Sequence, residues 1–314
     1  MTDGCGRTIR YLRLSVTDLC NYRCRYCMPE AGVFKRPHRD ILSVEECVEI
    51  GRAAVNCGVK KIRLTGGEPL VRGGILDICR GLSSIDGLEE LCMTTNGSLL
   101  PELAAPLRNA GVDRLNISLD SLRPERFSHI TRRGHLDDAL AGITAAERAG
   151  FTKLKCNVVL MGGINDDEIM DFVALTERKP WEIRFIELMP MGECAQWEKS
   201  RFIPAETVLE KVPALRPLKS SGTAARYGVP GWAGTVGLIR PMSHRFCGLC
   251  DRIRVTADGK LKPCLHSDAE LPLRGLHGPE LEEAIRRGIA QKPERHHLTE
   301  GGSDTLRNMN EIGG

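Results

Sequence analysis

The chain has 314 residues, of which 41% are hydrophobic, and its 44 Lys and Arg residues nearly balance its 41 Asp and Glu residues. This length suits one large α/β domain with an appendage, or two modest domains. The charge balance argues against a nucleic-acid coat protein, and we find neither an apolar run of bilayer length nor a signal peptide. The 13 cysteines are an odd number, so we expect reduced cysteines and a cytoplasmic location rather than a disulfide scaffold.

Residues 10 to about 190 alternate short strand-like runs with helical patterns, which is typical of a parallel sheet built from βα units. One helix is signalled clearly after the first run. Ser43 and Glu46 form a capping box, apolar residues then recur at helical spacing, and Gly58 ends the helix. The predicted strands cover residues 10–17, 60–66, 90–96, 113–120, 153–160 and 182–189.

The predicted strands are polar on one face, although parallel strands are usually apolar on both. Leaving a buried polar group without a partner costs about 1–3 kcal/mol, so these faces must line a wet or ligand-filled cavity. In a curved or barrel-like α/β sheet, that cavity opens at the carboxyl ends of the strands. The polar positions are Arg13, Ser15, Thr17, Arg63, Thr65, Thr94, Asn96, Asn116, Ser118, Asp120, Lys155, Asn157 and Arg184.

The pattern weakens between residues 190 and 235, and we place a domain boundary near residue 225, which gives domains 1–224 and 225–314. Beyond it, residues 235–242 and 252–256 read as strands, and Ala257-Asp258-Gly259-Lys260 signals a hairpin. The polar stretch that ends in Gly313-Gly314 predicts a flexible tail.

Three cysteines, Cys20, Cys24 and Cys27, follow the first predicted strand in one tight loop. Thiolates select zinc, copper(I) or iron–sulfur clusters over hard cations. A structural zinc site and a complete iron–sulfur cluster each want four protein ligands, and no fourth cysteine lies near. The triplet therefore predicts a cluster with one iron left open for a small molecule.

A second triplet consists of Cys247, Cys250 and Cys264. The hairpin between Cys250 and Cys264 can bring the three sulfurs together. A Cys₃His zinc site is a serious alternative here, because His266 lies two residues after Cys264.

The loop Thr65-Gly66-Gly67-Glu68-Pro69 follows the second predicted strand directly. Two glycines allow a close approach of backbone to a ligand, and the proline fixes the turn. Next to an open-cluster cysteine loop, these backbone groups could hold an amino-acid moiety that chelates the free iron.

The spacing Cys-x₃-Cys-x₂-Cys, with Tyr26 before the last cysteine and Gly66-Gly67-Glu68-Pro69 after it, resembles the radical S-adenosylmethionine superfamily. Within it, the whole chain closely resembles the GTP 3′,8-cyclase family of molybdenum cofactor biosynthesis. The narrowing motifs are residues 13–18, 94–97, 116–120 and 187–190, the Cys-x₂-Cys-x₁₃-Cys triplet and the terminal Gly-Gly.

The resemblance implies an incomplete (β/α)₆ TIM-like barrel whose mouth is closed by a small C-terminal domain. It also implies two [4Fe–4S] clusters, one on each triplet, and S-adenosylmethionine on the open iron of the first. The open iron of the second would bind the guanine base. The implied contacts to S-adenosylmethionine are Tyr26, Gly67, Ser118 and Met189. The implied GTP contacts are Arg13, Arg63, Thr94, Lys155, Arg252 and Arg254.

The implied reaction begins when one electron cleaves S-adenosylmethionine into methionine and a 5′-deoxyadenosyl radical. That radical removes the hydrogen at ribose C3′ of GTP, and C3′ then bonds to guanine C8. Arg252 and Arg254 are the implied catalytic residues, which would help to quench an aminyl-type radical. The Gly-Gly tail would reach the pocket and assist turnover.

The implied partners are a flavodoxin- or ferredoxin-type electron donor and the next enzyme of the pathway, cyclic pyranopterin monophosphate synthase. The chain would be a monomer or homodimer without nucleic acid or membrane. Two other readings stay open: a radical enzyme that modifies a peptide or RNA, with its second cluster used for electron transfer, and a zinc-stabilised binding module without catalysis.

Overall fold

In the computed structural model, which describes residues 1–220, 222–296, 298 and 303–313, one mixed sheet of twelve strands runs through the chain. Its centre is the parallel run β10-β1-β2-β3-β4-β5-β6-β9. These strands are β1 (Tyr11–Ser15), β2 (Lys61–Thr65), β3 (Glu90–Thr95), β4 (Arg114–Ser118), β5 (Lys155–Leu160), β6 (Glu182–Glu187), β9 (Thr235–Ile239) and β10 (Arg252–Val255).

Antiparallel strands extend the sheet at both ends, so the described strands form an open barrel rather than a closed one. Strands β11 (Lys260–Lys262) and β12 (Leu271–Pro272) continue from β10. Strands β8 (Ala225–Gly228) and β7 (Arg216–Leu218) continue from β9. The incomplete barrel predicted from the resemblance is confirmed: β1 to β6 are the six strands of its βα units, and β10 and β9 continue the parallel sheet on either side.

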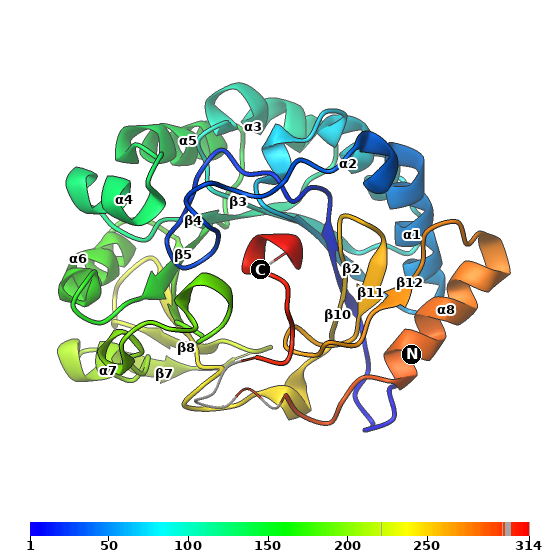
Figure 1. Ribbon diagram of the computed structural model, residues 1–314. Coiled ribbons are helices and arrows are strands. Elements are labelled where there is room, and N and C mark those ends of the chain that lie inside the picture. The colour runs from blue at the N-terminus through cyan, green and yellow to red at the C-terminus, as the bar shows by residue number, and fades with distance from the viewer. Residues whose placement is uncertain (221, 297, 299–302, 314) are drawn as a thin grey trace.

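The helices lie outside the curved sheet (Figure 1). They are α1 (Val44–Asn56), α2 (Ile75–Ser83), α3 (Leu100–Asn109), α4 (Pro124–Thr131), α5 (Leu136–Arg148), α6 (Ile169–Ala174), α7 (Thr207–Lys211) and α8 (Gly278–Ala290). The predicted capping box of α1 is present, since the Ser43 side chain accepts from the Glu46 amide and the Glu46 side chain accepts from the Ser43 amide. No helix among the described residues has the length and apolar character that crossing a membrane would require.

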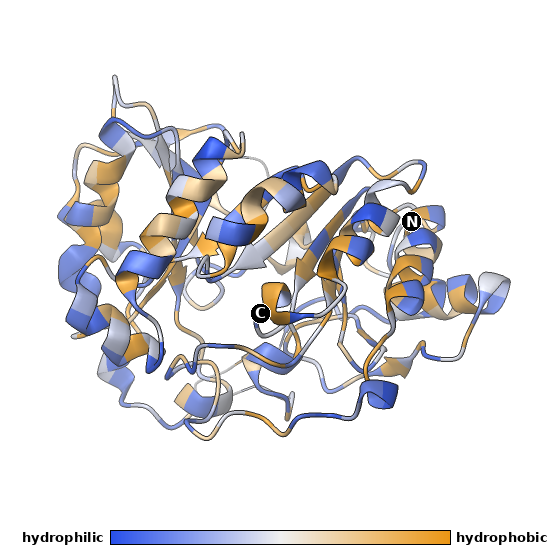
Figure 2. Cartoon of the chain, turned by 90° about the horizontal axis from the view of Figure 1, so that it is seen from above, coloured by the Kyte–Doolittle hydropathy of each residue, from blue (hydrophilic) through white to orange (hydrophobic). Residues whose placement is uncertain are grey.

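The core lies between the helices and the apolar face of the strands. Leu12, Leu14, Ile62 and Leu64 have no exposed surface. The helices are apolar toward the sheet and hydrophilic on their other side (Figure 2). Burial of one face by helices leaves the opposite, polar face of the strands directed into the barrel.

The C-terminal part of the chain completes this sheet. Strand β10 pairs in parallel with β1, and β9 pairs in parallel with β6. The hairpin predicted at 257–260 connects β10 to β11, with Gly259 in the left-handed region at φ 78°. Strands from both sides of residue 225 belong to this one sheet. The domain boundary near that residue stays a prediction.

Candidate active site

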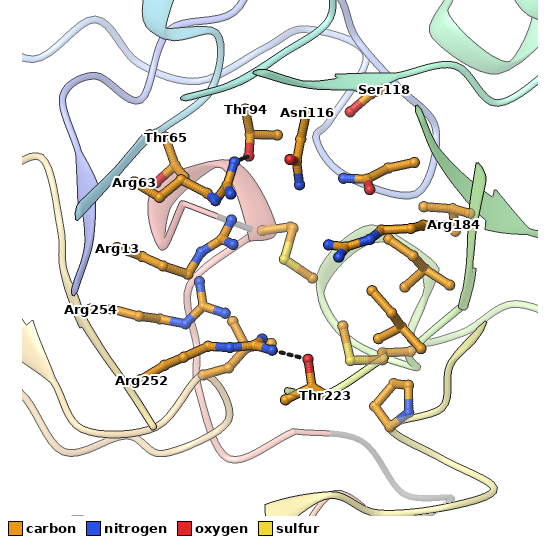
Figure 3. A pocket seen from close by; sticks show the side chains of 18 of the residues that line it. Arg13, Arg63, Thr65, Thr94, Asn116, Ser118, Arg184, Thr223, Arg252 and Arg254 are labelled. Atoms are coloured by element: carbon orange, nitrogen blue, oxygen red, sulfur yellow. Dashed lines mark hydrogen bonds between the residues drawn. The ribbon is translucent and has the colours of Figure 1, made fainter. Parts of the chain in front are cut away.

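A cavity of about 470 Å³ lies inside the barrel, a size typical of small-molecule sites. The cysteines of both triplets line it, as do most of the polar strand positions, so the predicted polar face does surround a cavity. Figure 3 shows guanidinium groups that enter the cavity from several strands. The two triplets are more than 200 residues apart in sequence, and the barrel brings them to one space.

The first triplet lies in the loop that follows β1. The amides of Cys27 and Met28 both donate to the Cys24 carbonyl, at 2.9 and 3.1 Å, which folds the loop into a tight turn. The Arg132 guanidinium, just after α4, donates to the carbonyls of Arg23 and Met28 at 3.0 and 3.1 Å. The cysteine loop is therefore held against the end of α4.

Tyr26 and Asp120 connect this loop to the opposite wall. The Tyr26 hydroxyl donates to the Asp120 carboxylate at 2.7 Å, and the other carboxylate oxygen accepts from the Val159 amide at 2.8 Å. Burial raises the pKa of Asp120 to about 6. Both side chains line the cavity, as do Gly67, Ser118 and Met189, the other residues implied to contact S-adenosylmethionine.

The two glycines of the 65–69 loop are required by close packing against the cysteine loop. A Cβ on Gly66 would stand 2.3 Å from the Thr17 carbonyl oxygen, and one on Gly67 would stand 2.3 Å from that of Leu19. The next residue, Glu68, is buried and accepts from the Thr95 hydroxyl and the Asn96 amide at 2.8 and 2.7 Å. This carboxylate, whose pKa burial raises to about 7, joins the glycine loop to the end of β3.

The cysteines of the first triplet are half-buried. Burial raises the pKa of Cys20 to about 11 and also raises the pKa values of Cys24 and Cys27. Thiolate ligands must lose their protons, so metal binding here has to release them. The three thiols line the cavity beside a glycine loop, and this donor set fits an iron–sulfur cluster.

The second triplet surrounds the start of β10, whereas the first triplet follows the end of β1. Cys247 begins a short 3₁₀ turn, Cys250 ends it just before β10, and Cys264 follows β11. Burial alone would raise the pKa of Cys250, but the charge of Lys292, followed by that of Arg252, outweighs it and lowers the pKa. Cys250 therefore favours the thiolate form more strongly than the cysteines of the first triplet do.

The spacing of possible ligands bears on the zinc alternative. In the part of the chain that the structure describes, no three His, Cys, Asp or Glu side chains are grouped as they would be around a single ion. His266 has its ring nitrogen Nδ1 3.1 Å from the Ser303 hydroxyl and packs against His296. The three thiols of the second triplet all line the cavity, and three cysteines are a donor set that an iron–sulfur cluster takes.

The cationic wall between the triplets is a row of arginines on neighbouring strands. The sheet register aligns Arg254 of β10 with Arg13 of β1, and Arg13 with Arg63 of β2. Burial and the charge of Arg254 hold the pKa of Arg13 well below its usual value, and burial with the charge of Arg252 lowers that of Arg254 to about 10. Such a row of crowded buried cations favours a polyanion in the cavity.

Of the other implied GTP contacts, Thr94 and Arg252 line the cavity, whereas Lys155 does not. The ammonium of Lys155 instead binds the Glu182 carboxylate at 2.7 Å. Arg184, from the next strand along, does reach the cavity (Figure 3). Its parity on β6 marked it as a cavity residue in the sequence, although the resemblance did not imply it as a contact.

Tyr11, which the sequence did not single out, also lines the cavity. Tyr11 accepts a hydrogen bond from Arg63 and lies under the guanidinium of Arg252. Burial alone would raise the pKa of Tyr11, but the charges of Arg63 and Arg13 outweigh it and lower the pKa to about 8. The side-chain oxygens of Asn116 and Asn157 are buried without a hydrogen-bond partner and line the same cavity, as groups that await a ligand do.

The C-terminal tail enters the cavity mouth at the centre of the barrel (Figure 1). The carbonyl of Gly313 accepts from Arg13 at 3.0 Å and from Arg254 at 2.8 Å. The Asn310 amide donates to the Asp18 carbonyl at 3.0 Å. The predicted flexibility of this tail stays a prediction, and Gly314 lies outside the described residues.

The chain matches two protein families, the Radical SAM superfamily over residues 14–176 and Molybdenum Cofactor Synthesis C over residues 181–298. A protein named GTP 3′,8-cyclase in Alkaliphilus oremlandii is 48% identical over 320 residues, covering 100% of both chains. Proteins of the same name in Peptoclostridium acidaminophilum and Geobacter sulfurreducens are 50% and 49% identical. They cover 100% and 95% of this chain, and 98% and 94% of their own lengths.

Solved structures share the fold at low identity. The enzyme anSMEcpe with bound AdoMet superimposes with a TM-score of 0.58 at 11% identity, covering 92% of this chain and 79% of its own. Streptococcus suis SuiB bound to S-adenosylmethionine gives a TM-score of 0.56 at 12% identity, covering 89% of this chain and 68% of its own.

Proposed function

Because the chain belongs to the radical SAM superfamily and, within it, to the GTP 3′,8-cyclases, we propose that its two cysteine triplets bind the two [4Fe–4S] clusters that the reaction uses. The chain is a lyase that converts GTP to (8S)-3′,8-cyclo-7,8-dihydroguanosine 5′-triphosphate, the first step of molybdenum cofactor biosynthesis. The observation that carries the proposal is that both triplets face one cavity across a row of arginines.

Cys20, Cys24 and Cys27 would hold the cluster that binds S-adenosylmethionine, and Cys247, Cys250 and Cys264 the cluster that binds guanine. When bound, the first cluster and S-adenosylmethionine supply a 5′-deoxyadenosyl radical that takes the ribose C3′ hydrogen, so that C3′ can bond to guanine C8. The residues of the chain position the two small molecules and exclude water and competing reactions.

The S-adenosylmethionine contacts proposed are Tyr26, Gly67, Ser118 and Met189. Tyr26 is held by Asp120, and Gly67 by its fit against the Leu19 carbonyl, so two of these contacts are fixed before ligand arrives. A site that is ordered in advance loses less entropy on binding.

The GTP contacts proposed are Arg13, Arg63, Thr94, Arg252 and Arg254, which line the cavity, together with Lys155. The ammonium of Lys155 would have to leave Glu182 to reach the nucleotide. Arginine binds phosphate through two parallel hydrogen bonds, so four guanidiniums can hold a triphosphate firmly. Arg252 and Arg254 are also proposed to assist when the aminyl-type radical on the base gains one electron and one proton.

The remaining parts of the proposal concern the cell. A low-potential flavodoxin or ferredoxin would deliver the electron, and cyclic pyranopterin monophosphate synthase would take the product. The chain would work in the cytoplasm as a monomer or homodimer. The Gly-Gly tail, whose Gly313 contacts Arg13 and Arg254, would assist turnover.

Substitution of one cysteine in each triplet tests which cluster serves S-adenosylmethionine and which serves GTP. The reconstituted chain should form 5′-deoxyadenosine and cyclised GTP from GTP, S-adenosylmethionine and dithionite without oxygen. We expect Cys24→Ala to abolish both products, and Cys250→Ala to abolish the cyclised product while the first cluster still assembles. Cys79→Ala is the matched control, since Cys79 is buried in α2 outside the cavity. Cyclised GTP from the Cys250→Ala chain would refute the assignment.

A further inference from the structure

Lys292 is a buried lysine beside the second cysteine triplet. It lies two residues after the end of α8, has 4% of its surface exposed and lines the cavity. Its ammonium group donates to two main-chain carbonyls, those of Arg252 and Pro263, each at 2.8 Å. A buried ammonium is costly unless negative charge is close to it.

Two other lysines, the buried Lys262 and the half-buried Lys155, show what such a group normally has. Lys262, with no exposed surface, lies 3.4 Å from the Glu270 carboxylate, and Lys155 lies 2.7 Å from that of Glu182. Within the described residues, Lys292 forms no ion pair with a carboxylate, and its hydrogen bonds leave its positive charge uncompensated. A cluster held by the second triplet would bring negative charge next to it.

The two carbonyls that Lys292 binds belong to the segments that carry the ligands. Pro263 precedes Cys264 directly, and Arg252 is two residues after Cys250. The ammonium group is thus fixed relative to at least two of the three sulfurs.

Arg7 connects the segment after Lys292 to the remaining cysteine of the triplet, Cys247. Its guanidinium donates to the Cys247 carbonyl at 2.9 Å and to the Pro293 and Glu294 carbonyls at 2.7 and 3.0 Å. Arg7 has its own counter-charge, because Asp3 pairs with it at 2.6 Å. Arg7 therefore ties the segment that carries Lys292 to the third ligand, and Lys292 is left as the cation whose partner is missing.

We propose that Lys292 is the counter-charge of the second cluster, a positioning residue that stabilises its reduced state. This inference rests on the proposed assignment of the second cluster to Cys247, Cys250 and Cys264. Reduction adds one electron from the low-potential donor and breaks no bond in the protein. A fixed positive charge nearby makes that added negative charge easier to accept.

The test measures the second cluster alone, in the full-length chain with Cys20, Cys24 and Cys27 all changed to Ala. An EPR-monitored redox titration gives the fraction of reduced cluster at each potential. We expect Lys292→Met to lower the ratio of reduced to oxidised cluster about tenfold at a fixed potential, which corresponds to about 59 mV for one electron. Lys292→Arg, which keeps the charge, should restore the ratio.

Lys262→Met is the matched control, because it also removes a buried lysine near Cys264 but one that Glu270 already neutralises. It should leave the ratio unchanged. An unchanged potential in Lys292→Met, with about four irons still bound, would overturn the inference. So would an equal shift in the Lys262→Met control.

Loss of the cluster in the variants is also decisive. If Lys292→Met and Lys292→Gln both fail to bind iron while Lys292→Arg binds it, the need for charge is supported, because Gln keeps a donor for the carbonyls. If Lys292→Arg fails as well, Lys292 serves packing and the inference is wrong. Failure of the parent chain to assemble its second cluster would instead overturn the proposed function.

Discussion

Single residues set the charge of the cavity. The row Arg254, Arg13 and Arg63 places three guanidiniums side by side. Burial and a neighbouring guanidinium both lower the pKa values of Arg254 and Arg13. Tyr11 is the group in this row that can become negative near neutral pH, since its pKa is lowered to about 8. A triphosphate and a tyrosinate would compete for the same cations.

This competition predicts a pH dependence of GTP binding. Tyr11 is protonated below pH 8 and becomes an anion above it, so affinity should fall as the pH rises. At pH 9 the loss is roughly tenfold if GTP binds only to the protonated form. In Tyr11→Phe the same rise from pH 7 to pH 9 should change affinity little. Anaerobic calorimetry of both chains measures this, and equal pH slopes would contradict it.

The sequence allowed most of these residues to be predicted, because strand parity assigns side chains to faces. Asn116, Asn157 and Arg184 were placed on the cavity face by parity alone, and they line the cavity. Lys155 shared that parity but bonds to Glu182 near the start of both strands, away from the cavity. Lys292 carried no signal, because its burial depends on contacts with Arg252 and Pro263, distant in the sequence.

At the scale of elements, two loops build the first site together. The cysteine loop after β1 and the glycine loop after β2 share backbone hydrogen bonds, with the Gly67 and Glu68 amides donating to the Thr17 and Leu19 carbonyls at 2.8 Å. The sequence predicted that the glycines permit a close approach. The sequence could not show which segment comes close, and the structure shows that it is the cysteine loop.

Gly67→Ala tests this contact. The added Cβ would stand 2.3 Å from the Leu19 carbonyl oxygen, and forced overpacking of this kind typically costs about 1–3 kcal/mol of unfolding free energy. We expect a lower denaturation midpoint and weaker S-adenosylmethionine binding. Gly73→Ala is the control, since nothing lies within 4 Å of its Cβ position. Wild-type stability and binding in Gly67→Ala would show that the two loops tolerate separation.

At the scale of the whole molecule, chain ends meet at the site. Strand β10 joins β1 from the far end of the sequence, and the tail reaches the arginine row. The sequence predicted β10 and the hairpin after it from local patterns. Their place beside β1 could not be predicted in that way, because it depends on pairing between residues about 240 apart.

The tail contact predicts a separation of binding from turnover. A chain that ends at Asn308 lacks the Gly313 carbonyl, which accepts from Arg13 and Arg254. The carbonyl then no longer occupies these guanidiniums in place of phosphate, so GTP should bind at least as tightly as to the full chain. Turnover should fall roughly tenfold or more, because the cavity mouth is open to water. Full turnover by the shortened chain would show that the tail is dispensable.

The central claim is that two cysteine triplets present two open clusters to one cavity, with GTP on the second. The most direct test is the EPR spectrum of the reduced second cluster with and without GTP, in the chain whose Cys20, Cys24 and Cys27 are Ala. The account predicts that GTP changes this spectrum, and that the change is lost in Arg13→Ala/Arg254→Ala at the same GTP concentration. A spectrum that GTP leaves untouched at saturation would contradict the account.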